Sequence, residues 1–167
     1  MQSPSPSAPA AAIDALEPST APGGPDVRAR PAVLGASGGV GTSTLARDLG
    51  FIDEGRWCKS SASRTVVVAA AGTADGMAAA LDCVQMLQGG SGRIVVAVID
   101  DGGGPCPPAV KARKLLLDGY VHAVVDVPYV PVWRYGGTRA EPTTAYLDAI
   151  RQLTTIATAP PPARSMS

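Results

Sequence analysis

Short apolar runs alternate along the chain with longer stretches of mixed polarity. Residues 65–70 (TVVVAA), 93–99 and 121–127 are mostly apolar and rich in β-branched side chains, which is typical of strands buried on both faces. Residues 32–34 make a shorter run of the same kind. We predict a strand at each of these places.

The stretches between these runs have the period of amphipathic helices. In the clearest example, one helical face collects the side chains of Met77, Ala80, Leu81, Val84 and Leu87. A second helix opens at residues 107 and 108, because proline suits the first turn of a helix. The predicted helices span residues 42–49, 76–87, 107–117 and 143–156.

Strand and helix alternation predicts the α/β fold class, with one domain whose mostly parallel sheet of four or five strands is covered by helices. Seven of the 16 prolines lie in residues 1–31, in a Ser/Ala/Pro run without any period. Such a run cannot bury enough apolar surface to offset its chain entropy. We therefore expect a disordered arm at residues 1–30, the folded domain at 31–157 and a disordered tail at 158–167.

Candidate chemistry lies in the glycine-rich segment VLGASGGVGTSTLA, residues 33–46, between the first strand and the first helix. Glycines let the backbone approach a ligand, and the N–H groups at a helix start attract an anion. The segment resembles the P-loop of the ParA/MinD family, whose motif reads Lys-Gly-Gly-Val-Gly-Lys-Thr. The matching residues run from Ser37 to Ser43, and both lysines are missing. Thr42 stands where the motif has its phosphate-binding lysine.

This resemblance implies a nucleotide site, with ATP or another nucleotide and magnesium as the cofactor. Ser43 is the magnesium ligand that the motif implies. Residues 127–134 (VPYVPVWR) are similar to the family's proline loop, which borders the adenine base. The implied nucleotide-binding residues are Gly38, Gly39, Val40, Gly41, Thr42, Ser43, Thr44, Pro128 and Tyr129. The whole pattern looks like an uncharacterised actinobacterial group of P-loop-like proteins tied to plasmids or integrated elements.

The same alignment lacks the aspartate that holds magnesium in the family. Residues 50–64 are too few for the helix and strand that normally deliver it. Asp100 and Asp101 close a later strand and are the alternative, although Asp101 before three glycines also suits a turn. Phosphoryl transfer depends on neutralising charge, so we expect weak nucleotide binding or a scaffold role without ATP hydrolysis.

Two enzyme interpretations compete with the P-loop. Residues 35–41 also look like the turn of an NAD(P)-dependent Rossmann oxidoreductase, which needs an acidic residue about 20 positions later. The region offers Ser60, Ser61 and Ser63 instead, and no tyrosine is followed by a lysine four positions later.

The other enzyme interpretation is a nucleophile elbow, because Ser37, Asp100 and His122 follow the chain order of an α/β-hydrolase triad. The elbow would follow the first strand, too early for that fold, and His122 is better explained as a polar residue at a strand's entrance. A tight turn that needs glycine for packing alone is a further explanation of the segment.

Charge and composition exclude other classes. The 14 basic residues balance 14 acidic ones, so bulk charge does not favour nucleic acid. We find no signal peptide or membrane span, and three cysteines without metal-ligand spacing, so we expect a cytoplasmic protein with reduced thiols. The expected partner is another protein or a second copy of the chain, with residues 128–134 as a contact surface unless Trp133 belongs to the core.

Overall fold

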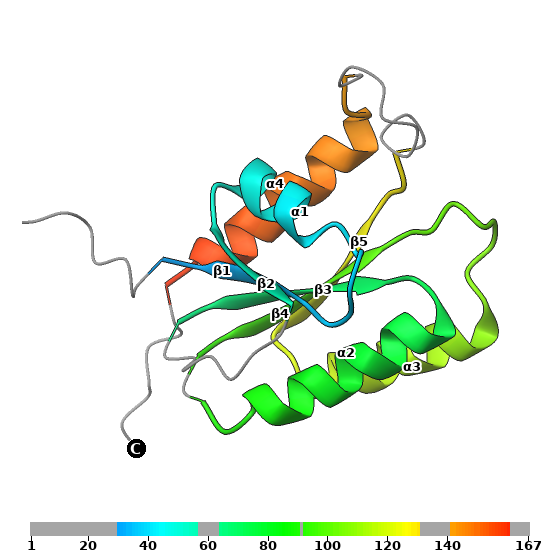
Figure 1. Ribbon diagram of the computed structural model, residues 1–167, viewed down its shortest axis with the longest axis horizontal. Coiled ribbons are helices and arrows are strands. Elements are labelled where there is room, and N and C mark those ends of the chain that lie inside the picture. Colours follow the sequence, from blue (N-terminus) through cyan, green and yellow to red (C-terminus); the bar gives the residue numbers. More distant parts are fainter. Residues whose placement is uncertain (1–29, 57–63, 91, 131–140, 161–167) are drawn as a thin grey trace, which may run out of the picture.

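The computed structural model describes residues 30–56, 64–90, 92–130 and 141–160. Five strands form one parallel sheet in the spatial order β2-β1-β3-β4-β5 (Figure 1). The strands are β1 (Ala32–Gly35), β2 (Ile52–Arg56), β3 (Val66–Ala71), β4 (Ile94–Ile99) and β5 (Ala123–Val127).

Helices cover both faces of this sheet. The helices α1 (Thr42–Leu49) and α4 (Thr144–Thr158) pack on one face, and α2 (Ala74–Leu87) and α3 (Pro108–Asp118) pack on the other (Figure 1). The predicted α/β class with a parallel, helix-covered sheet is therefore confirmed. The arms at 1–29 and 161–167, and the loop with Trp133, lie outside the described residues.

The strand sequences explain the two layers of core. Successive side chains of a strand point to opposite faces, so a strand covered by helices on both sides must be apolar throughout. In β3, Val67 and Ala69 belong to the core under α1 and α4, whereas Val66, Val68 and Ala70 belong to the core under α2 and α3. These five side chains are fully buried.

The strand β2 was not predicted, and its sequence shows why. It reads IDEGR, without the apolar run or the alternation that indicates a strand. As the edge strand it pairs with β1 alone, so it does not need two apolar faces. Glu54 of β2 forms an ion pair with Arg64.

The order of the strands creates a crevice. The chain runs from β1 to β2 on one side, then crosses to β3 on the other side of β1. In doubly wound sheets, ligands bind outside the carboxyl ends of the strands at the point where the order reverses. Here that point lies between β1 and β3.

Two further observations concern the cysteines and membranes. Burial of Cys83 in α2 raises the pKa of its thiol to about 12, so the thiolate is disfavoured. Cys106 is half-buried, and neither cysteine forms a disulfide. Among the helices in the described ranges, none has the length and apolarity to cross a membrane.

Candidate functional site

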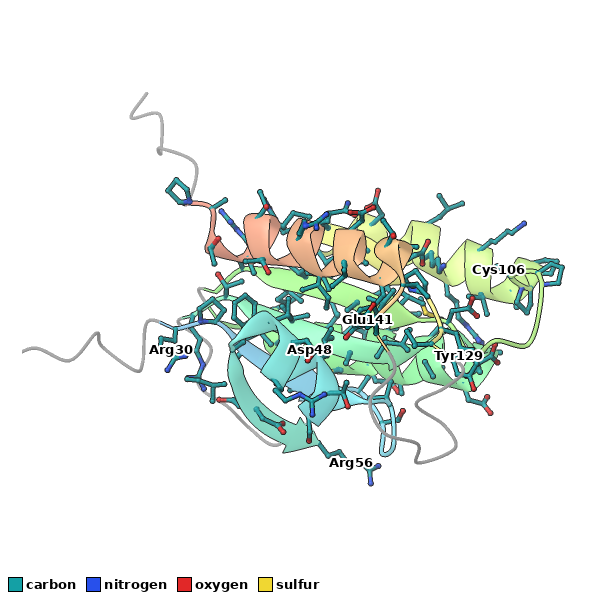
Figure 2. All side chains as sticks on the ribbon, turned by 90° about the horizontal axis from the view of Figure 1, so that it is seen from above. Arg30, Asp48, Arg56, Cys106, Tyr129 and Glu141 are labelled. Carbon is teal, nitrogen blue, oxygen red and sulfur yellow. The ribbon has the colours of Figure 1, made fainter. Side chains whose placement is uncertain are left out.

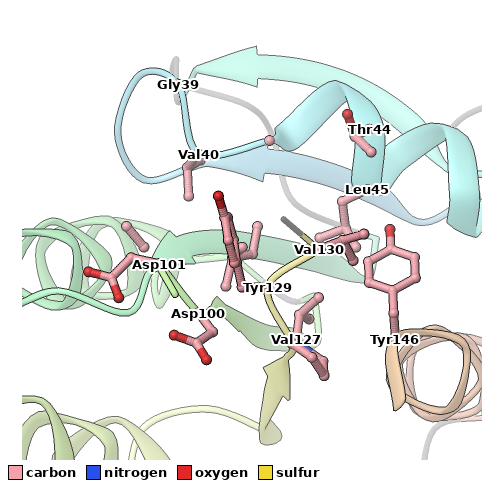
Figure 3. A pocket seen from close by; sticks show the side chains of 14 residues that line it. Gly39, Val40, Thr44, Leu45, Asp100, Asp101, Val127, Tyr129, Val130 and Tyr146 are labelled. Carbon is pink, nitrogen blue, oxygen red and sulfur yellow. The ribbon is translucent and has the colours of Figure 1, made fainter. Parts of the chain in front are cut away.

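A cavity of about 360 Å³ opens at the carboxyl edge of the sheet, at the point where the strand order reverses (Figure 3). Its walls come from the turn after β1, the ends of β3, β4 and β5, and the helices α1 and α4. We call it the switch-point cavity. It is lined by Gly39, Val40, Gly41, Thr44, Leu45, Ala71, Ile99, Asp100, Asp101, Val127, Pro128, Tyr129, Val130 and Tyr146.

The β1–α1 turn, residues 36–41, forms one wall of this cavity. Gly39 and Gly41 have φ values of 73° and 83°, a conformation in which a side chain is strained. Gly35 has a different reason to be glycine, because a Cβ there would lie 2.5 Å from Thr42 Oγ1 and 3.2 Å from Val40 Cγ1. The glycines thus serve both the turn's shape and its packing.

The first turn of α1 has backbone N–H groups without a side-chain cap. Its N-cap is Gly41, which has no acceptor, and no acidic residue lies in the first turn. The first backbone N–H group with an acceptor within the helix is that of Leu45, which donates to Gly41 O at 3.0 Å. The preceding N–H groups favour an anion, because they carry the positive end of the helix dipole.

Tyr129 stands opposite this turn. A Cβ at Gly102 would lie 2.5 Å from Tyr129 Cδ1, so the ring packs directly on the β4–α3 loop. Gly102 also has a φ of 73°, which makes glycine doubly required. The hydroxyl of Tyr129 points toward the β1–α1 turn near Val40 (Figure 3). The ring thus forms a flat aromatic wall next to the helix start.

Two carboxylates border the cavity after β4. Asp100 Oδ1 accepts from Gly102 N at 3.0 Å, and Asp101 Oδ1 accepts from Gly103 N at 2.9 Å. Both side chains therefore shape the loop, as the sequence suggested for Asp101. Both residues also line a neighbouring cavity of about 430 Å³ on the α2 and α3 side. Within the part of the chain that the structure describes, the residues that line the switch-point cavity include these two acids and no Lys, Arg or His.

Tyr146 closes the cavity from α4. Its hydroxyl donates to Asp48 Oδ2 at 2.9 Å, which links α4 to α1 across the same face of the sheet. No sequence pattern predicts this contact, since the two residues are 98 positions apart. Asp100 was named as a magnesium candidate, but its place beside the glycine turn depends on the strand order.

The structure brings together six of the nine nucleotide-binding residues expected from the resemblance. They are Gly39, Val40, Gly41, Thr44, Pro128 and Tyr129. Gly38, Thr42 and Ser43 do not line the cavity. Thr42 is half-buried with its Oγ1 over Gly35, and Ser43 is exposed, whereas the carboxylates of Asp100 and Asp101 line the cavity.

The hydrolase interpretation requires contacts that this fold does not provide. Ser37 follows β1 at the carboxyl edge of the sheet, whereas His122 precedes β5 and its N–H donates to Ile94 O at the opposite edge. In a parallel sheet these two positions are separated by the length of the strands. Ser37 and His122 therefore cannot form a triad.

The oxidoreductase interpretation needs one correction. The serines at 60, 61 and 63 lie outside the described residues. The strand β2 ends at Arg56, which is paired in register with Gly35. Figure 2 shows Arg56 projecting from the tip of β2. A cation rather than a serine therefore stands beside the glycine-rich turn.

Comparisons of this chain with protein-family models, with curated proteins and with solved structures find no significant match.

Proposed function

We propose that this domain binds a nucleotide in the switch-point cavity and does not hydrolyse it. The observation that carries the proposal is the meeting of two segments far apart in the sequence. The uncapped start of α1 at Gly41 faces Tyr129, which follows β5. One supplies N–H groups for a phosphate and the other an aromatic ring for a base.

The charges around the cavity limit what happens to the nucleotide. Among the described residues, the lining of the cavity carries Asp100 and Asp101 and no basic side chain, so this lining does not neutralise a triphosphate by itself. Positive charge is also what phosphoryl transfer requires in its transition state. Binding therefore depends on the backbone, the aromatic ring and a metal ion, while hydrolysis lacks its cations.

Magnesium fits this arrangement only together with the nucleotide. Among the described residues, no group of three His, Cys, Asp or Glu side chains is placed to hold a metal ion. Magnesium commonly binds through one or two carboxylates plus substrate phosphates. Asp100 and Asp101 are the acids at the cavity, and a metal ion there would offset their repulsion of a phosphate.

Calorimetric titration with ATP and magnesium tests the proposal, using wild type and Thr42→Lys. A lysine at this position restores the charge that the P-loop motif has, so we expect affinity to rise about tenfold to a hundredfold. Thr155→Lys is the matched control, because it adds the same charge near the exposed end of α4. Its affinity for ATP should equal that of wild type.

Two results would contradict the proposal. If folded Thr42→Lys binds ATP no better than Thr155→Lys does, the turn is a packing feature and the proposal fails. Steady release of phosphate from ATP by pure wild-type protein, lost in Gly41→Val, would contradict the absence of hydrolysis.

Arg56 supports a second candidate, a dinucleotide. In Rossmann folds the end of the second strand meets the ribose of the cofactor, and an arginine there accommodates the 2′-phosphate of NADP. Arg56 ends β2 next to Gly35 and is exposed. Under this candidate, NADP raises the melting temperature by several degrees at a hundred times its dissociation constant and NAD does so less. Arg56→Ala should abolish that difference, whereas ATP binding by the first candidate should be unaffected.

A further inference from the structure

The outer surface of α3 carries an apolar cluster. Leu115 is 77% exposed and Leu116 is 56% exposed, and Tyr120, just beyond the helix, is 59% exposed. Met86 of the neighbouring α2 adds a side chain that is 53% exposed. Gln88 Nε2 donates to Tyr120 O at 3.3 Å, which holds the ends of the two helices together. Large apolar side chains gathered on one surface indicate an interaction site.

The inner side of α3 is fixed, so this cluster cannot turn inward. Val110 and Leu117 are fully buried against the sheet. Lys114 forms an ion pair with Asp126 of β5, which sets the rotation of the helix. Leu115 lies two residues before Leu117, about 200° around the helix, and therefore points away from the domain.

Charged residues lie before and after Leu115 along the helix. Lys111 and Asp118 are exposed and lie one helical turn before and after Leu115, on the same side of α3. If two copies of α3 lie antiparallel about an axis between residues 114 and 115, Lys111 of each copy faces Asp118 of the other. The same relation places Leu115 near the axis.

We infer that α3 is the contact helix of a symmetric homodimer. A two-fold interface brings one patch against a second copy of itself, so the patch must be complementary to its own reversed image. An apolar side chain with a cation one turn before it and an anion one turn after it meets that condition. A different partner protein would require no such symmetry. This inference concerns the α2 and α3 face and is independent of nucleotide binding.

Charge reversal on the full chain tests the inference by analytical ultracentrifugation. In Lys111→Glu, both contacts of a homodimer place an acid against Asp118. In Asp118→Lys, both place a base against Lys111. Each variant alone should dimerise at least tenfold more weakly than wild type. When the two variants are mixed, every contact is again between opposite charges, and dimers should return.

Further variants separate this interface from general effects. Leu115→Ser should weaken the dimer, because it removes the apolar centre. Asp148→Lys reverses a charge on the exposed side of α4 and should leave the dimer unchanged. Circular dichroism checks that each variant is folded. Wild-type protein that stays monomeric up to about 1 mM, or a mixture that associates no better than its components, would overturn the inference.

Discussion

Two turns leave adjacent strands at the same edge of the sheet and are built in opposite ways. The β1–α1 turn ends at Gly41 and leaves the start of α1 without a side-chain cap. The β3–α2 turn ends at Thr73, whose Oγ1 accepts from Gly76 N at 3.1 Å. Asp75 adds a negative charge in the first turn of α2. The second helix start therefore satisfies one of its N–H groups with its own side chain, while the first has no side-chain cap and leaves its N–H groups for a ligand.

Glycine is required for different physical reasons in the two turns. Gly76 in α2 is required by packing, because a Cβ there would lie 2.8 Å from Ala71 Cβ. Gly41 has ordinary space around it but a φ of 83°. One glycine permits close approach of helix and strand, and the other permits a backbone shape that opens onto the cavity.

The largest expected effect is on packing. Gly76→Val should lower the free energy of unfolding by about 3 kcal/mol, because the added side chain collides with the end of β3. Urea denaturation measures this. Gly89→Val is the matched control, since a Cβ at Gly89 meets nothing within 4 Å, and it should be near neutral.

Alkylation of Cys83 measures the loosening of α2 that Gly76→Val should cause. The raised pKa and the burial of this thiol make it slow to react with iodoacetamide at pH 8. Gly76→Val should speed the reaction, because it weakens the packing of α2 on the sheet. Because the raised pKa favours the neutral thiol, Cys83 stabilises the fold below pH 9, and this contribution is lost as pH rises toward about 12. Unchanged stability and unchanged alkylation would show that α2 does not need close contact with β3.

Substitution of Gly41 should lower the free energy of unfolding less than Gly76→Val does, but it should strongly weaken nucleotide binding. Gly41→Ala should cost about 1 kcal/mol, because alanine is disfavoured at positive φ. It should also weaken nucleotide binding at least tenfold in calorimetry, since the turn can no longer keep its shape. Gly38→Ala is the control in the same turn, where open space and ordinary φ permit a side chain. Equal nucleotide affinities for Gly41→Ala and Gly38→Ala would erase the distinction between the two turns.

The cap of α2 provides the converse test. Thr73→Ala should reduce the free energy of unfolding by about 1 kcal/mol, as expected for the loss of an N-cap. Nucleotide affinity should not change, because Thr73 does not line the switch-point cavity. Thr73→Ser, which keeps the hydroxyl, should recover most of the stability. A loss of nucleotide binding in Thr73→Ala would mean that the capped turn also takes part in the site.

The smallest effect is expected at Asp75. Its carboxylate lies at the positive end of the α2 dipole, so Asp75→Asn should cost about 0.5 kcal/mol at low ionic strength. Thermal denaturation at low and high salt measures it, because salt screens an exposed charge. A difference that does not shrink in high salt would point to a hydrogen bond rather than to the dipole.

Elements whose pattern reflects burial can be predicted from the sequence. The apolar run at residues 65–70 predicts a strand covered on both sides, and the strand forms at Val66–Ala71, one residue later at each end. The helix at Thr42–Leu49 has the bounds that its glycine flanks and apolar spacing predict. Local propensity, turn residues and hydrophobic period agree there, so no distant contact was needed to decide these elements.

Tertiary structure alone decided β2 and the composition of the cavity. The sequence IDEGR becomes a strand because β1 offers it an edge, and its own pattern carries no such signal. The resemblance named Gly39 and Tyr129 separately, but their meeting depends on β5 lying beyond β4 in the sheet. Thr42 and Ser43 belong to the same motif, yet neither lines the cavity. Strand order arises from long-range packing of helices on the sheet, which no local window of sequence contains.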